Sequence, residues 1–253
     1  MTKATRRFSV MVRHSMCSVA LLVAAFAGSG WAAAGDRDLA GGILNDSSFT
    51  PIFQAMVRYF PDDAAKLEAE LRSKAAQLGV DDQEIIPTES VEALSATTSR
   101  SFEKFFDRHG PDAYHAPDLD VRAVLQSRIQ AIKFYEGKGN QCNIALIYGM
   151  HADELDPLPN DLVQRGSLAN FVAMYAGSKA ETKRPRLKVY TAELRAKIFQ
   201  GLDAEEEALI STPSISNPKT CSANIKLFEN IWRATGHDAE LYRAETLLLF
   251  MTR

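Results

Sequence analysis

Apolar side chains recur at helical spacing along most of the chain. In the first clear case Phe53, Met56, Val57 and Phe60 stand at i, i+3, i+4 and i+7, so they share one face of a helix. A threonine and a proline at 50 and 51 are typical of a helix start, and the proline at 61 ends the segment. The same spacing predicts further helices over residues 62–78, 88–109, 117–136, 161–176, 190–200, 203–210, 220–234 and 237–252. Glycines 79, 110, 177 and 201 are expected to end four of them, and the glycines at 137 and 139 are expected to end a fifth.

The short apolar run at 142–148 fits a helix or a buried strand by periodicity alone. We favour a helix because its neighbours are helical, and no alternating pattern with hairpin turns occurs elsewhere. The sequence therefore predicts an all-α fold, a compact bundle of about eight to ten helices whose topology stays open. We expect residues 50–253 to form a single domain. The loop 151–160 holds two prolines and three acids, so it is the best candidate boundary if the domain has two halves, at 50–150 and 161–253.

The N-terminus has the pattern of a targeting segment. Residues 1–17 contain four basic side chains and no acid, 18–31 are apolar or small, and three alanines end at Ala34. This pattern predicts a signal peptide over 1–34, cut after Ala34, followed by a flexible lead over 35–49. An uncleaved anchor is the alternative, but the run is shorter than the roughly 20 residues that span a bilayer. We expect a periplasmic or secreted protein, with the general secretory route favoured over the twin-arginine route.

Composition and charge exclude several classes of protein. The chain has 253 residues, 46% of them hydrophobic, which is enough for a packed core and argues against intrinsic disorder. Its net charge is -3, and the chain from residue 35 carries 25 basic against 32 acidic side chains, or -7. General nucleic-acid binding is therefore not expected, because it needs a basic excess.

Two cysteines remain after the predicted cleavage, Cys142 and Cys221. Cys221 shares a helix face with Ile225 and Phe228, and Cys142 shares one with Ala145, so both sulfurs should point into the core. An even pair in an exported chain predicts a disulfide. Two buried free thiols are the alternative, and without a Cys-x-x-Cys spacing a redox pair is disfavoured.

Metal and cofactor motifs are weak. His109 and His115 are six residues apart, whereas a helical zinc site needs two histidines four apart. The acidic run that includes His151, Asp153, Glu154 and Asp156 lacks the order of an EF-hand. We therefore assign no metal and no cofactor.

Catalytic motifs are equally sparse. Ser101 to Lys104 and Ser216 to Lys219 match the Ser-x-x-Lys spacing of penicillin-binding enzymes, but the accompanying Lys-Thr-Gly is missing. Carboxylates for glycoside cleavage need no short motif, so Glu89, Glu103 and Glu154 stay open as candidates near helix ends and loops. The balance is against an enzyme.

The sharpest local charge feature is a basic segment that holds five cations against one acid, namely Lys179, Lys183, Arg184, Arg186 and Lys188 with Glu181. It predicts either a contact patch for an anionic partner or a solvated loop. We expect an exported binding protein with a protein partner in the envelope, such as an adaptor or an immunity-type inhibitor, and no stable membrane anchor. A helical hydrolase acting on cell wall or lipid and a structural envelope protein are the alternatives, and the oligomeric state is open.

Overall fold

The computed structural model describes residues 50–80, 87–150, 152 and 154–251. The predicted signal peptide, the lead over 35–49 and parts of the 151–160 loop lie outside these residues. Within them the chain is all-helical and contains no strand, so the predicted fold class is confirmed. The described residues form ten α-helices and one 3-10 helix, with these bounds: α4 Thr50–Tyr59, α5 Pro61–Leu78, α6 Thr88–His109, η1 Gly110–His115, α7 Asp118–Phe134, α8 Gln141–Tyr148, α9 Asn160–Ser178, α10 Ala192–Ile198, α11 Ala204–Ser211, α12 Lys219–Arg233 and α13 His237–Met251.

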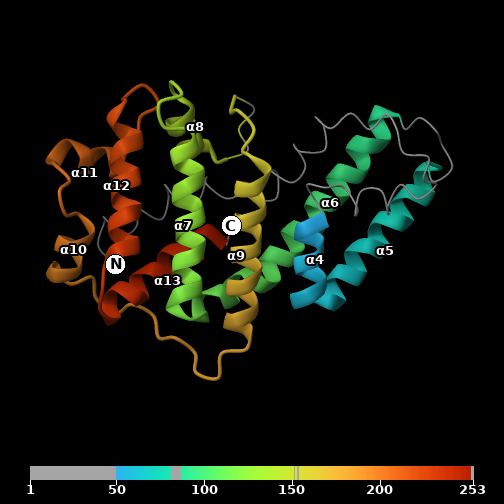
Figure 1. Cartoon of the computed structure of the whole chain (residues 1–253), viewed down its shortest axis with the longest axis horizontal. Helices are drawn as coiled ribbons and strands as arrows, with labels where there is room; N and C mark the ends of the chain where they lie inside the picture. The colour runs from blue at the N-terminus through green and yellow to red at the C-terminus, as the bar shows by residue number, and fades with distance from the viewer. Residues whose placement is uncertain (1–49, 81–86, 151, 153, 252–253) are drawn as a thin grey trace.

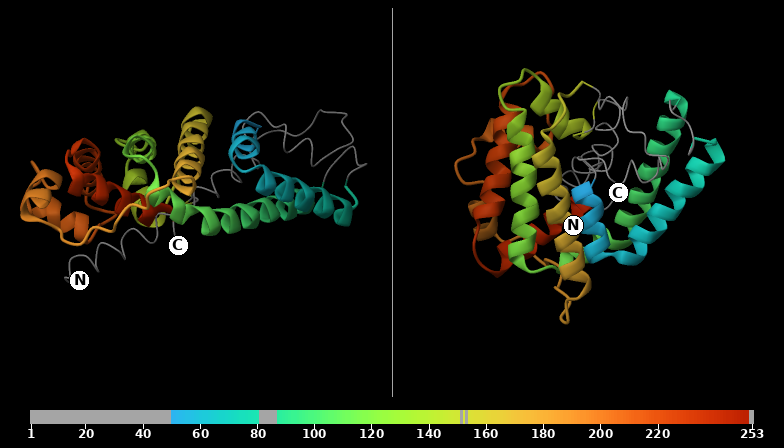
Figure 2. Two further views of the ribbon diagram at one scale, coloured as in Figure 1. Left: turned by 90° about the horizontal axis from the view of Figure 1, so that it is seen from below. Right: turned by 45° about the vertical axis from the view of Figure 1, so that its right-hand side comes forward.

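The helices form two crossed layers and a projecting arm. Helices α12, α7, α9 and α4 lie side by side in one row, which Figure 1 shows from the front and the left view of Figure 2 nearly end-on. Helix α13 and the end of α6 run across the back of this row, and η1 joins them. Helices α10 and α11 flank α12, whereas α5 and α6 diverge from the row as a two-helix arm.

Local sequence explains where the arm begins and turns. Phe60 separates α4 from α5, and Pro61 occupies the first position of α5, where its missing N–H costs nothing. Gly79 ends α5 with φ of 64°, a left-handed cap that favours glycine. Leu67 and Leu71 are buried on α5 as the apolar stripe predicts. Elsewhere the expected cap Asp203 begins α11 through a complete capping box with Glu206.

Gly177 does not end a helix as its sequence position suggested. Helix α9 continues through it to Ser178, and Gly177 is buried against the backbone of η1. A Cβ built on Gly177 would lie 1.8 Å from the carbonyl oxygen of Asp112. The glycine therefore permits close contact between α9 and η1 rather than a turn.

Two other expectations at helix ends also need correction. Helix α7 ends at Phe134, before the glycines at 137 and 139 that were expected to stop it, although both have positive φ in the following turn. Tyr190 precedes α10 rather than joining it, and its ring stacks on Tyr242.

A disulfide joins Cys142 on α8 to Cys221 on α12, with 5.6 Å between the two Cα atoms, as the sequence predicted. Residues 142–148 are helical, which also settles the ambiguous run. Next to the disulfide, the buried Asn143 donates from its amide to the carbonyls of Ile215 and Asn217 at 2.8 and 2.9 Å. These contacts fix the loop before α12 against α8.

A buried ion cluster ties α7 to the two C-terminal helices. The Arg243 side chain has no exposed surface and donates through Nε and Nη2 to the Asp118 carboxylate, both at 2.8 Å. Arg122 donates to the same carboxylate at 2.7 Å. Both arginines also donate to the carbonyl of Ala234, just past the end of α12. Burial alone would raise the pKa of Asp118, but the bonds from Arg243 and Arg122 outweigh it and hold that pKa below its ordinary value.

Candidate functional site: a polar groove on the two-helix arm

The basic segment 179–188 lies against the body of the protein. Lys183 donates to the carbonyl of Gly177 at 3.4 Å, and Arg184 donates to the carbonyl of Ala116 at 2.6 Å. Arg186 pairs with Glu245 at 2.9 Å. Three of the five predicted cations therefore hold the segment on α9, on α13 and on the residue that follows η1. Within the described part of the chain, the side chains of the other two have no hydrogen bond or ion pair, and the Lys179 ammonium lies over the Tyr175 ring.

His115 helps to hold the same segment. Its Nδ1 accepts a hydrogen bond from the backbone N–H of Arg184 at 3.0 Å, which requires that nitrogen to be unprotonated. Burial lowers the pKa of His115, and the neighbouring Lys183 lowers it further. Both effects favour the neutral form that the hydrogen bond needs.

His109, the other histidine considered as a ligand, lies at the base of the arm. Its Nε2 is 3.0 Å from Asp63 Oδ2, and its ring packs against Phe60 and Phe105. Arg108 pairs with the same carboxylate. Over the described ranges no group of three His, Cys, Asp or Glu side chains could hold a metal ion, and His151 and Asp153 lie outside those ranges.

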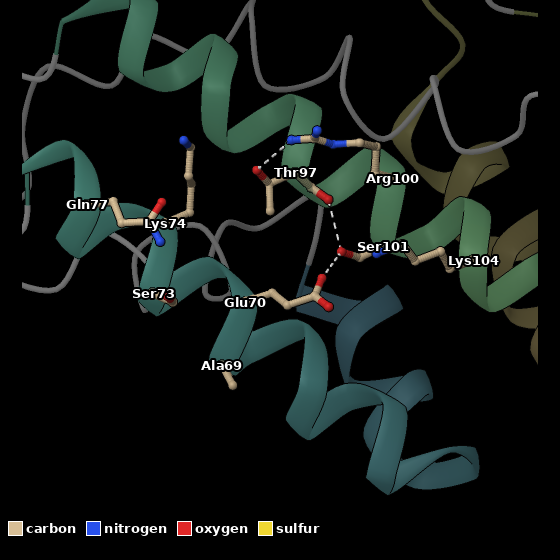
Figure 3. A pocket seen from close by; sticks show the side chains of 9 residues that line it. All are labelled: Ala69, Glu70, Ser73, Lys74, Gln77, Thr97, Arg100, Ser101 and Lys104. Atoms are coloured by element: carbon tan, nitrogen blue, oxygen red, sulfur yellow. Dashed lines mark hydrogen bonds between the residues drawn. The ribbon is translucent and has the colours of Figure 1, made fainter.

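The arm carries an open groove of about 440 Å³ between α5 and α6, which we call the arm groove. One wall comes from α5 and the other from α6, as Figure 3 shows. Its lining residues are Ala69, Glu70, Ser73, Lys74 and Gln77 from α5, and Thr97, Arg100, Ser101 and Lys104 from α6. Three cations thus oppose one carboxylate in a chain whose net charge is negative.

A hydrogen bond between Ser101 Oγ and the Glu70 carboxylate crosses the middle of the groove (Figure 3). Arg100 donates to its own helix, to the carbonyl of Ala96 at 3.2 Å and to Thr97 Oγ1 at 3.5 Å. Among the described residues, no hydrogen bond or ion pair engages the side chain of Lys74 or of Lys104.

The groove contains one of the two Ser-x-x-Lys matches, Ser101 to Lys104. Ser101 lies in the interior of α6, where backbone N–H groups bond to carbonyls four residues earlier and none points outward. Acyl transfer needs donors aimed at the developing oxyanion, and a helix interior offers no backbone N–H for that purpose. In the second match Lys219 pairs with Glu205, and Ser216 Oγ lies 3.2 Å from Ser214 Oγ.

The structure does not bring the candidate glutamates together at one site. Glu89 is at the start of α6 and Glu154 is exposed in the loop after α8, while Glu103 is on α6 beside the groove residue Lys104. None of the three candidate glutamates lines the groove, whereas Ser101 and Lys104 both do. Sequence reasoning missed Glu70, Lys74 and Arg100, because the groove depends on how two separate helices are aligned.

No family model, curated protein or solved structure matches the chain. In the part of the chain that the structure describes, no helix has the length and apolar character needed to cross a membrane.

Proposed function

We propose that the protein is an exported binding protein that recognises a protein partner in the cell envelope through its two-helix arm. The proposed compartment rests on the signal-peptide pattern that ends at Ala34, and the disulfide between Cys142 and Cys221 is compatible with it. The proposed activity rests on the arm.

The observation that carries the proposal is the arm groove. Helices α5 and α6 extend beyond the row of packed helices, and the groove between them presents polar side chains from both. Lys74 and Lys104 offer ammonium groups that no described residue engages. By contrast, three of the five cations of the basic segment already bond to the protein itself.

The construction of the body supports recognition by a rigid surface. The disulfide and the buried cluster of Asp118 and Arg243 fix α7, α8, α12 and α13 to one another. At the base of the arm, Asp63 on α5 pairs with two residues at the end of α6, Arg108 and His109. A preorganised surface loses less conformational entropy on binding, which favours a specific partner.

Site-specific photo-crosslinking in the producing cell tests this function. A photoreactive residue replaces Ser73 or Gln77 in the groove and, as a matched control, the exposed Gln126 on α7. We expect one discrete adduct from both groove positions and none from Gln126. Adducts of equal yield from all three positions, or none from the groove, would contradict the proposal.

Export is tested separately. We expect the protein recovered from the envelope or the medium to have Gly35 as its first residue when its intact mass is measured. A recovered form that keeps the apolar run at 18–31 would contradict the predicted cleavage and with it the proposed compartment.

A further inference from the structure

We infer that the arm groove binds an acidic peptide segment of a protein partner, in extended conformation, with two carboxylates about three residues apart. This inference rests on the proposed function and specifies the chemistry of the partner. Three features of the groove carry it: the available cations, their spacing and the carboxylate between them.

The two lysines are placed to attract anions. Lys104 is exposed and Lys74 is half-buried in the groove wall, and neither has an anionic partner among the described residues. Arg100 adds a third positive charge beside Lys74, although it also bonds to its own helix. Opposite charges at such a surface steer a ligand and fix its register.

The spacing of the lysines follows from the alignment of the two helices. The contact between Glu70 and Ser101 places these residues at one level, and the helices run in opposite directions. Lys74 is four residues beyond Glu70 and Lys104 is three residues beyond Ser101, so the two lysines lie at opposite ends of the groove (Figure 3). At 1.5 Å per residue their Cα atoms are separated by roughly 10 Å along the groove. An extended chain rises about 3.3 Å per residue, so three residues cover this distance.

Glu70 decides which anions fit. Its carboxylate lies between the two lysines and would repel a negative charge placed at the centre of the groove. A ligand with charges at the two ends and a neutral, hydrogen-bonding centre avoids this repulsion. A nucleic-acid backbone or an anionic membrane has closely spaced charges, so both match the groove less well than a peptide with separated acids.

Fluorescence anisotropy with labelled peptides tests the inference on the exported chain. The first peptide has two glutamates separated by two serines, the second has the same residues with the glutamates adjacent, and the third has lysines in place of the glutamates. We expect only the first to bind with measurable affinity, and we expect added salt to weaken that binding. The inference fails if the first peptide does not bind or if the adjacent glutamates bind equally well.

Variants assign the binding to the groove. We expect the double variant Lys74→Glu and Lys104→Glu to bind the first peptide roughly tenfold more weakly or worse. The matched control, Lys179→Glu with Lys188→Glu, makes the same change of charge on the basic segment and should leave binding unchanged. Equal weakening by both pairs, or none from the groove pair, would overturn the assignment.

Glu70→Gln tests the selectivity directly, because it removes the central repulsion with little change of shape. We expect the variant to bind the adjacent-glutamate peptide at least as tightly as the wild type binds the spaced one. Unchanged selectivity would refute the role of Glu70. Tighter binding of phosphatidylglycerol vesicles than of the spaced peptide, lost in the groove variant, would replace the peptide with a lipid surface.

The crosslinking experiment separates this inference from the proposed function. A discrete adduct at Ser73 without affinity for the spaced peptide would leave the binding function standing and overturn the acidic-peptide chemistry. Peptide binding without any adduct at Ser73 or Gln77 would contradict the function in the cell.

Discussion

Gly177→Ala should be strongly destabilising, although alanine normally strengthens a helix. The added Cβ would lie 1.8 Å from the carbonyl oxygen and 2.6 Å from the carbonyl carbon of Asp112, and 3.1 Å from the backbone nitrogen of Ala116. These are backbone atoms of η1 and its end, so no side chain can rotate away. Helix α9 and η1 must therefore move apart at the centre of the fold.

The cost can be set against a glycine in the same helix. Overpacking of a core typically costs about 1–3 kcal/mol of stability. Because the added methyl group would meet backbone atoms at so short a distance, we expect Gly177→Ala to lower the unfolding free energy by about 3 kcal/mol or more. At Gly166 the nearest atom to a Cβ is Ser127 Oγ at 3.6 Å, an ordinary contact. Gly166→Ala should therefore stabilise the protein by about 0.5–1 kcal/mol, because alanine loses less backbone entropy on folding.

Thermal and guanidinium unfolding followed by circular dichroism, with the disulfide intact, measures both variants. For a chain of this size we expect Tm to fall by roughly 6–12 °C in Gly177→Ala and to rise by a few degrees in Gly166→Ala. The opposite signs within one helix are the test. If Gly177→Ala matched the wild type, or both variants shifted Tm in the same direction, the close contact between α9 and η1 would be wrong.

Three further predictions concern the buried cluster, the disulfide and His115. Asp118→Asn should lower the unfolding free energy by about 3 kcal/mol, because it leaves the buried Arg243 charge without its counter-ion. A loss below about 0.5 kcal/mol in guanidinium unfolding would contradict this prediction. Because the pKa of Asp118 is lowered in the folded state, its contribution should be present above the unfolded value near 4 and be lost as pH falls through the folded one. Cys142→Ser, Cys221→Ser and the double variant should each lower the unfolding free energy by a similar amount, about 4.5 kcal/mol by the chain-entropy model for the 79-residue separation. Two reactive thiols in the unfolded, unreduced protein would refute the bond. The pKa of His115 is lowered in the folded state, so the wild type should lose stability as pH falls below the unfolded value near 6.5. His115→Asn keeps a hydrogen-bond acceptor and should lose less stability over the same pH range. Equal pH profiles of unfolding free energy for the two proteins would refute this role.

The sequence predicted the features that depend on a local pattern of residues or on which residue types can form a bond with each other. Helix periodicity located nearly every helix, and the capping residue Asp203 was correctly placed. The disulfide was predicted because only Cys142 and Cys221 follow the predicted signal peptide. It could not predict that Arg243 is buried, because a charged residue on an apolar helix face is buried only when another helix supplies its counter-ion, here Asp118. The arm groove could not be predicted for the same reason, because the packing between α5 and α6 determines that Glu70 lies opposite Ser101.

The glycines show the same limit and also explain how the arm is held. Gly79 is a terminator by local geometry, with φ of 64°, and local sequence identified it correctly. Gly110 follows α6 in right-handed helical geometry, and a Cβ there would lie 2.5 Å from the carbonyl oxygen of Met251 on α13. Together with Gly177, it lets η1 approach α9 and α13 at backbone distance. Because α6 runs directly into η1, these contacts anchor the base of the arm to α9 in the row of helices and to α13, which crosses behind that row. The orientation of the arm groove is therefore fixed by close backbone packing rather than by a hinge, which is the condition under which two lysines can select ligand charges by their spacing.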